Sequence, residues 1–300
     1  MTSNADSSGW FEDVDPDDLS GARDAIEHGT SESPADWPVE AVEDGFAADE
    51  DDYYDKLHEA TIAAAREQVR ERERADDRQL VHAVRAMDDA RRTANELAER
   101  VAEWAGSRYD DAGTGVEYAR ELADADTGGE HEETGAAPDY GATSASDPSA
   151  ERLRALAART AELADEADQL ERFVETAAHD VAPNLAAMAG PVLAARLISL
   201  SGGLDDLAKS PSSTVQVLGA EDALFAHLRG NAPSPKHGVI YTHEYVRGTR
   251  ETDRGSAARA LAGKLTIAAR VDHYSGERRP ELDAELDERI RTIRQRGADE

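Results

Sequence analysis

The sequence contains no cysteine among its 300 residues, which excludes disulfide bonds, a thiol nucleophile and thiolate metal ligands. Aromatic residues make up only 5%, a share that suits helices packed through Ala and Leu better than a large β-sandwich. The longest apolar run, Leu185–Leu200, includes Arg196 and is too short and too charged to cross a bilayer. No apolar signal segment follows Met1. We therefore expect a cytoplasmic, mainly α-helical protein without a membrane partner.

Lysine is also scarce, since it provides only Lys56, Lys209, Lys236 and Lys264 among 33 basic residues. The 64 acidic residues bring the formal net charge to -31. An acid-rich, lysine-poor composition is typical of halophilic proteins, because a Debye length of about 3 Å at 1 M salt screens the self-repulsion. A disordered acidic chain is the alternative, and it suits the ends of the sequence but not the apolar middle.

The negative charge is unevenly distributed. Residues 1–180 carry 17 basic and 48 acidic groups, whereas residues 181–280 carry 12 and 9, and residues 281–300 carry 4 and 7. Because nucleic-acid sites are locally basic, the segment 181–280 is a candidate for contact with a phosphate backbone. Charge alone leaves open a second interpretation, in which these arginines merely pair with nearby carboxylates.

Motifs for catalysis and metal binding are missing. The histidines of the basic segment, His227, His237, His243 and His273, form no HExxH pair. The sequence has neither a GxxxxGK[ST] phosphate loop nor a GxSxG nucleophile elbow. We predict no catalytic or metal-binding residue, and expect a partner to carry out any reaction that the protein serves.

Residues 1–60 form the first predicted region, a short acidic N-terminal segment. Met1–Asp55 contains 18 acidic residues and only Arg23 as a base, with prolines scattered along it. This composition predicts little regular structure. The aromatic residues Trp10, Phe11 and Trp37 are exceptions, and we expect them to dock on the chain's own body or on a partner.

Residues 61–180 form the second predicted region, an antiparallel coiled-coil hairpin. One helix covers Leu80–Ala105, a flexible acidic loop covers 124–149, and a second helix begins near Pro148 with Ser149 as a candidate N-cap. Apolar residues in this second helix alternate spacings of three and four, a period of 3.5. They are Leu153, Leu156, Thr160, Leu163, Ala167, Leu170, Val174 and Ala177. We assign Leu156, Leu163 and Leu170 to self-dimerisation; an isolated hairpin is the alternative.

Residues 181–280 form a third, all-helical region, followed by a C-terminal helix and tail at 281–300. The apolar run Leu185–Leu200 predicts a buried helix that Gly202-Gly203 ends, and Gly255–Tyr274 predicts a long amphipathic helix. Further helices are expected to start near Ser212 and Glu221.

Within this region, Pro235-Lys236-His237-Gly238 predicts a turn that presents two polar side chains and an approachable backbone, features suited to folded RNA. Further guanidinium groups could bind phosphate. They belong to Arg229, Arg247, Arg250 and Arg254.

Four consecutive stretches resemble the signature of the Nop domain. They are VAPNLAAMAGPVLAARLISLSGGLDDLAKS (181–210), PSSTVQVLGAEDALFAHLRG (211–230), PSPKHGVIYTHEYV (233–246) and RGSAARALAGKLTIAARVDHYSG (254–276). Upstream, DDRQLVHAVRAMDDARRTANELAERVAEW (76–104) resembles the first coiled-coil helix of the archaeal scaffold proteins in this family. The resemblance thus covers the first predicted coiled-coil helix and the basic region.

The resemblance implies an archaeal-type scaffold of a box C/D ribonucleoprotein. In that family a coiled coil joins two copies, and an N-terminal α/β domain holds the methyltransferase fibrillarin. The Nop domain binds a kink-turn guide RNA together with a ribosomal-type kink-turn-binding protein. The assembly methylates ribose 2′-hydroxyl groups of rRNA or tRNA. S-adenosylmethionine would belong to fibrillarin, so we expect no cofactor here.

Site residues follow from the resemblance by position. The surface for RNA and the kink-turn-binding protein would comprise Glu221, Arg229, Lys236, His237, Gly238 and Arg254. Lys236 lies where a related protein places an RNA-stacking side chain, and Arg270 is expected to form a structural ion pair. Tyr53, Tyr54 and Leu57 resemble the end of the fibrillarin-binding domain, of which the short N-terminal segment would be an α/β remnant.

We therefore expect a noncatalytic scaffold of a box C/D RNA methylation complex. The alternative is an acidic coiled-coil assembly protein that binds a protein partner without RNA.

Overall fold

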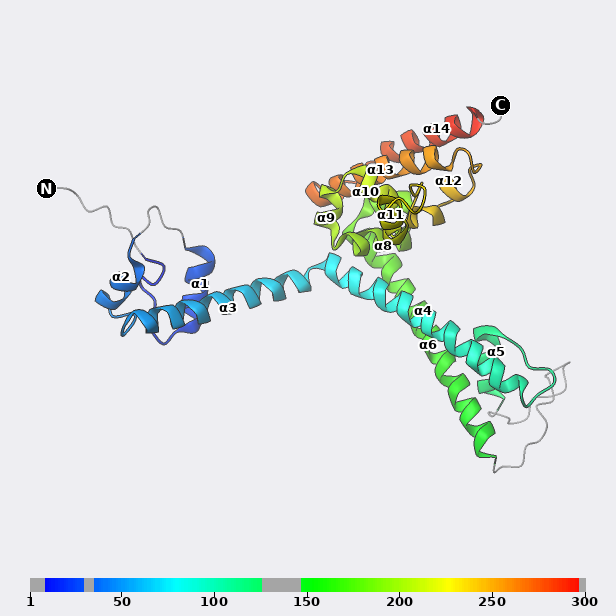
Figure 1. Ribbon diagram of the computed structural model, residues 1–300, viewed down its shortest axis with the longest axis horizontal. Coiled ribbons are helices and arrows are strands. Elements are labelled where there is room, and N and C mark those ends of the chain that lie inside the picture. Colours follow the sequence, from blue (N-terminus) through cyan, green and yellow to red (C-terminus); the bar gives the residue numbers. More distant parts are fainter. Residues whose placement is uncertain (1–8, 30–34, 126–146, 297–300) are drawn as a thin grey trace. The chain divides into compact units, whose positions relative to one another are not determined.

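The computed structural model describes residues 9–29, 35–125 and 147–296, and within these ranges it is helical and contains no strand (Figure 1). The mainly α-helical class predicted from the sequence is confirmed. The chain forms two compact units, Met1–Ala75 and Asp76–Glu300, which are described separately.

The first unit contains three helices, α1 (Leu19–His28), α2 (Trp37–Glu43) and α3 (Glu50–Arg74). The prediction of little regular structure before Asp55 was wrong for the described residues, and these residues show no α/β remnant. The acidic side chains help to start the helices: Asp18 accepts a hydrogen bond from the Ser20 N–H, and Asp49 accepts one from the Asp52 N–H. Acidic residues in the first turn of α3 also suit the helix dipole.

An aromatic cluster holds the first unit together. Phe11, Phe46 and Tyr53 are buried, and Trp10 donates an indole hydrogen bond to the Tyr53 hydroxyl over 3.1 Å. Phe11 also makes an edge contact with Trp37. The N-terminal aromatic residues therefore dock on their own unit, one of the two outcomes that the sequence allowed.

The second unit begins with an antiparallel helical hairpin of α4 (Asp76–Gly106) and α6 (Pro148–Val181), which lie side by side in Figure 1. Arg91, midway along α4, contacts Glu171 over 2.9 Å. Arg108, just after α4, pairs with Asp147 at the start of α6. The cap of α6 is Asp147 rather than Ser149, because its carboxylate accepts the N–H groups of Ser149 and Ala150.

The buried face of α6 includes four of the eight predicted seam residues, Leu153, Thr160, Ala167 and Val174. Its fully buried residues include Leu153, Ala157, Thr160, Ala167, Val174 and Ala178. The three leucines assigned to dimerisation, Leu156, Leu163 and Leu170, are only half-buried and follow one another at seven-residue intervals along the edge of the hairpin. The hairpin thus closes mainly through small residues and leaves a leucine column partly uncovered.

A short helix, α5 (Gly115–Asp124), lies beside the far end of the hairpin and was not predicted. Tyr118 and Leu122 are buried together with Val101 of α4 and Leu153 of α6. Most of the predicted acidic loop, residues 126–146, lies outside the described residues.

The remaining elements of the second unit are short helices followed by a long helical pair (Figure 1). They are α7 (Pro183–Ala189), α8 (Pro191–Ser201), α9 (Leu204–Lys209), α10 (Ser212–Val217), α11 (Glu221–Leu228), η1 (Val239–Thr242), α12 (Glu244–Arg247), α13 (Arg254–Tyr274) and α14 (Glu281–Arg296).

The apolar run predicted as one helix forms two. Gly190 separates α7 from α8 with φ +80°, a left-handed conformation that strains other residues, and Pro191 follows at the first position of α8. No single helix in the described ranges is long and apolar enough to cross a membrane; only α7 and α8 together meet that test, and they are bent by 118°.

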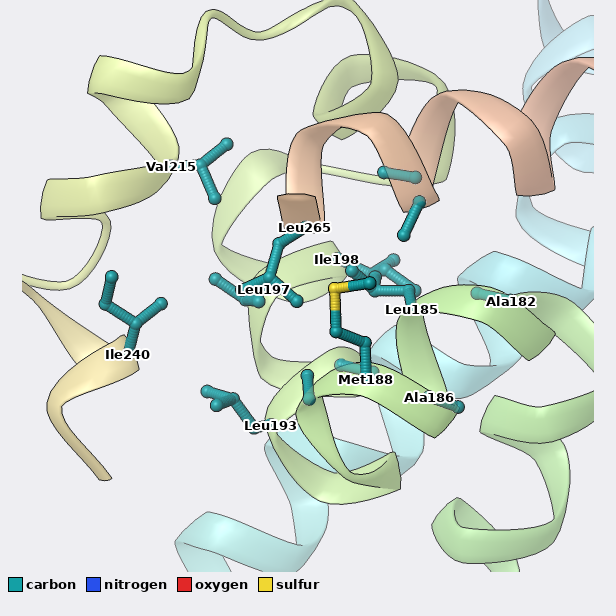
Figure 2. Close-up of a cluster of buried hydrophobic side chains, with 14 of the residues drawn as sticks. Ala182, Leu185, Ala186, Met188, Leu193, Leu197, Ile198, Val215, Ile240 and Leu265 are labelled. Carbon is teal, nitrogen blue, oxygen red and sulfur yellow. The ribbon is translucent and has the colours of Figure 1, made fainter. Parts of the chain in front are cut away.

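The core of the second unit draws on many of these elements. Figure 2 shows Leu185 and Met188 of α7 facing Leu197 and Ile198 of α8, with Leu265 of α13 beside them. Val215 of α10 and Ile240 of η1 are completely buried against the same cluster. The predicted inner face of the long helix at Gly255–Tyr274 is confirmed.

Polar contacts attach α4 to α8 and α9. Arg196 of α8 forms two hydrogen bonds with the Asp88 carboxylate, at 3.0 and 2.5 Å. Arg85 donates to the Ser199 hydroxyl and carbonyl oxygens, and Asp77 accepts the Leu204 N–H at the start of α9. The first half of α4 is therefore fixed to the helices that follow the hairpin.

A buried carboxylate joins α13 to the start of α7. Asp272 is 7% exposed, and its oxygens accept the Asn184 N–H and side-chain amide and the Leu185 N–H over 2.6–2.9 Å. The Asn184 side-chain oxygen in turn accepts the Arg279 N–H in the turn before α14. One carboxylate thus organises three segments.

We predict that Asp272→Asn lowers the free energy of unfolding by about 3 kcal/mol, because the amide N–H₂ cannot accept one of these buried N–H groups. Urea denaturation followed by circular dichroism measures the change. Glu175→Gln, on an exposed position of α6, is the matched control and should stay within about 0.5 kcal/mol of the wild type. Equal stability of the two variants would contradict the role assigned to Asp272.

Candidate nucleic-acid interface

The α11 helix lies on the surface of the second unit and has no buried residue. Phe225 and Leu228 expose 52% and 71% of their surface, although both are large and apolar. Arg229 follows directly and is also exposed. An exposed apolar helix face is typical of a protein-binding site. The cation beside it is suited to contact a polyanion that adjoins the bound protein.

A tight backbone contact positions the loop after α11. The Gly238 N–H donates to the Gln216 carbonyl oxygen over 2.8 Å, and the Val239 N–H donates to the Leu218 carbonyl oxygen over 2.7 Å. The Gln216 side chain donates to the Lys236 carbonyl oxygen over 2.7 Å. Lys236 and His237 are therefore held on a fixed loop rather than a free one.

Gly238 is required by this internal contact. A Cβ atom at Gly238 would lie 1.9 Å from the Leu218 carbonyl oxygen, a separation that no side chain tolerates. The sequence predicted that the backbone at this glycine can lie close to another surface. In the structure, that surface is the chain's own connection between α10 and α11. Glu221 also supports this connection, since its carboxylate accepts the Gly219 N–H over 2.8 Å.

His237, Tyr241 and Arg254 form one stacked group. The His237 and Tyr241 rings lie 4.6 Å apart at an interplanar angle of 23°, and the Arg254 guanidinium is 5.6 Å from the Tyr241 ring centroid. Arg254 is oriented by a hydrogen bond from its Nε to the Thr249 carbonyl oxygen. Tyr241 was not among the site residues predicted from the sequence.

Burial lowers the pKa of His237 below its usual value, and the positive charges of Arg254 and then Lys236 lower the pKa further. The imidazole is therefore neutral near pH 7, where it can stack and accept or donate a single hydrogen bond.

Several cations of the basic segment are exposed and, within the described ranges, unpaired. Arg229, Lys236, Arg247 and Arg259 are exposed, and none has a carboxylate within 4.0 Å among the residues that the structure describes. Arg250, by contrast, pairs with Asp253. These cations are therefore available to a phosphate backbone, as the phosphate-binding interpretation requires.

Arg270 has a structural role, but the ion pair expected for it is absent from the described residues. Its guanidinium donates to the carbonyl oxygens of Ala208 and Ser210 at the end of α9. A cation is favourable at that position because of the helix dipole.

The other predicted site residues lie elsewhere. In the first unit Tyr53 is buried in the aromatic cluster and Leu57 is half-buried against it, whereas Tyr54 is 51% exposed. Only Tyr54 among these three offers a largely open side chain to a partner.

Comparison with known sequences now identifies the family. Residues 131–295 match the family described as "Nop: snoRNA binding domain, fibrillarin". The chain belongs to the Nop family. The match includes all of the candidate interface, and its description names a snoRNA-binding domain.

Nop family relatives include a NOP5 family protein of Methanocaldococcus jannaschii, which is 49% identical over 43% of this chain and 31% of its own length. Nucleolar protein 58 of Debaryomyces hansenii is 33% identical over 67% of this chain and 43% of its own length. Nucleolar protein 56 of Saccharomyces cerevisiae is 42% identical over 42% of this chain and 25% of its own length. The chain spans less than half the length of each of these relatives.

A Nop family structure, that of a fibrillarin/Nop5p complex, aligns over 91% of both chains with 24% identity and a TM-score of 0.49.

We predict that NMR titration of His237 gives a pKa below that of an unperturbed histidine, and that Arg254→Gln raises this pKa, because removing the nearby charge makes protonation less unfavourable. The pKa should remain below the usual value in the variant, since burial persists. Arg247→Gln, which changes an exposed α12 side chain, serves as the control. A His237 pKa that does not respond to Arg254→Gln would contradict the stacked arrangement.

Proposed function

We propose that this protein is a noncatalytic scaffold of a box C/D guide-RNA complex that directs ribose 2′-O-methylation. The observation that carries the proposal is the pair of exposed cations Arg229 and Lys236, which have no carboxylate within 4.0 Å among the described residues and lie within the region matching the snoRNA-binding family. These cations occur in a chain whose overall formal charge is -31.

RNA and protein would bind the candidate interface together. A local balance of 12 basic and 9 acidic residues releases few counterions, so phosphate contacts alone give little affinity, least of all in concentrated salt. The exposed Phe225 and Leu228 supply apolar area next to Arg229. We infer a composite surface in which a kink-turn-binding protein covers α11 while the guide RNA contacts Lys236, His237 and the backbone near Gly238.

The chemistry would belong to a partner. A fibrillarin-type methyltransferase would bring S-adenosylmethionine, and the first unit would receive it, with Tyr54 as its exposed aromatic contact. Pairing between guide and target RNA would select the methylated nucleotide, so the scaffold itself needs no catalytic group.

Self-association would join two such scaffolds. The half-buried column of Leu156, Leu163 and Leu170 runs at seven-residue spacing along one edge of the hairpin. A second copy of this column would cover these side chains and complete a helical bundle.

We predict that the wild-type protein binds guide RNA poorly alone and tightly once the kink-turn-binding protein is present, as measured by gel-shift titration. The charge reversals Lys236→Glu and Arg229→Glu together should weaken the ternary complex at least about tenfold, a loss of about 1.4 kcal/mol.

The matched control is the double variant Arg152→Glu/Arg159→Glu, which changes two exposed arginines of α6 away from the interface. Equal RNA affinity with and without the protein partner would contradict the composite surface. RNA binding that is indifferent to reversal at Lys236 and Arg229 would favour the alternative, an acidic coiled-coil assembly protein that binds a protein without RNA.

We predict that Leu163→Asp/Leu170→Asp converts a dimer into a monomer in sedimentation-velocity experiments, because unpaired carboxylates would be buried between the two copies. Arg159→Asp, on an exposed position of the same helix, should leave the dimer intact. Circular dichroism should show unchanged helicity in both variants. If the wild type sediments as a monomer, the leucine column serves only the hairpin.

A further inference from the structure

Two adjoining hollows extend from the candidate interface along α13 to α14. The first, of about 570 Å³, lies among α10, the loop at Ser234–Lys236 and the start of α13. The second, of about 400 Å³, lies between α13 and α14, which run side by side in Figure 1. Arg259 lines both hollows, so the two adjoin at this residue, and we refer to them together as the path.

The residues lining this path share a chemistry. Neither hollow is lined by an aspartate or glutamate, although the chain contains 64 of them. The first hollow offers the hydroxyl groups of Ser213, Thr214 and Ser234 beside the Lys236 ammonium. The second offers the Ser256 hydroxyl with the guanidinium groups of Arg259 and Arg289. Hydroxyl groups and cations together are the donors that contact phosphate oxygens.

The cations along the path are available for a ligand. Arg259 and Arg289 are exposed, and neither has a carboxylate within 4.0 Å in the described part of the chain. Lys264, at the edge of the second hollow, differs because it already pairs with Glu285 of α14. Arg296 lies seven residues after Arg289 and extends the same face of α14.

The α13 backbone is unusually accessible between these cations. Gly255, Arg259 and Gly263 recur at intervals of four and so share one face of the helix. A Cβ atom at Gly263 would have no neighbour within 4 Å, and one at Gly255 would meet only the Lys236 side chain, at 3.9 Å. A polyanion can therefore approach the helix closely on either side of Arg259.

We propose that Lys236, Arg259 and Arg289 form a track, here named the α13 track, that binds the sugar-phosphate backbone of an RNA arm beyond the candidate interface. This inference rests on the proposed function and adds a second contact to it. No aromatic side chain lines either hollow, so bases have no ring on which to stack, and the track would bind without reading sequence. By binding this backbone, the track fixes the direction in which the RNA arm leaves the candidate interface.

The test uses the full-length protein with the kink-turn-binding protein and two guide RNAs. One RNA ends just beyond the kink, and the other continues into a longer arm. The variant is Arg259→Gln/Arg289→Gln, which removes both guanidinium charges but leaves Lys236 in place. Arg152→Gln/Arg159→Gln on α6 removes the same charge elsewhere and is the matched control.

For the long-arm RNA, the track variant should lower the slope of log affinity against log salt by about 1.4 to 1.8, as expected for two lost phosphate contacts. The loss should be the same for long arms of different sequence. The short RNA should bind the variant and the wild type equally, and the control should match the wild type with both RNAs.

Equal losses for both RNAs, or a variant that behaves like the control, would overturn the α13 track while leaving the proposed function in place. A loss of affinity for the protein partner in the absence of RNA would also overturn it, because the track would then be an acidic-protein site. If the wild-type complex binds neither RNA, the proposed function itself fails. Circular dichroism of each variant verifies that it is folded.

Discussion

The interface depends on a main-chain contact between two short segments, Gln216–Leu218 and Lys236–Val239. Backbone N–H groups must be paired when they leave water, and here Gly238 and Val239 find partners in the neighbouring segment rather than in a helix. The contact is close enough that only glycine fits at position 238. It fixes where Lys236 and His237 emerge, and so converts an irregular loop into a defined surface.

The distribution of charged partners separates the structural cations from the available ones. Arg85 and Arg196 bind side-chain and backbone oxygens that attach α8 to α4, and Arg270 binds the end of α9. Arg229 and Lys236 have no acidic partner within 4.0 Å in the described ranges, despite the large excess of carboxylates in the chain. The absence of a carboxylate near a cation therefore indicates an anion-binding role more specifically than the number of basic residues does.

The sequence predicted the long elements well because their apolar periodicity is repeated many times. The extents of α13 and of most of α4 and α6 followed from it. The N-terminal helices were missed because acidic residues were interpreted as a sign of disorder, whereas Asp18 and Asp49 act as caps. The break at Gly190 was missed because an apolar run hides a turn whose residues remain buried on both sides.

The details of the interface were less predictable than its location. The basic segment and the turn at Lys236 were evident, but the stacking of His237 on Tyr241 and the support from Gln216 depend on contacts between separate elements. Single-residue patterns carry no information about such pairs. The same limit applies to α6. Its periodicity predicted the helix and half of its buried seam, but it also placed Leu156 and Leu163, which are only half-buried, in that seam.

The polar clamp between α4 and α8 has a geometrical consequence. Because Asp88 binds Arg196 and Asp77 binds the start of α9, the hairpin and the helices after it behave as a single stiff arm. If two copies pair through their hairpins as proposed, this stiffness would set a fixed distance between their two candidate interfaces.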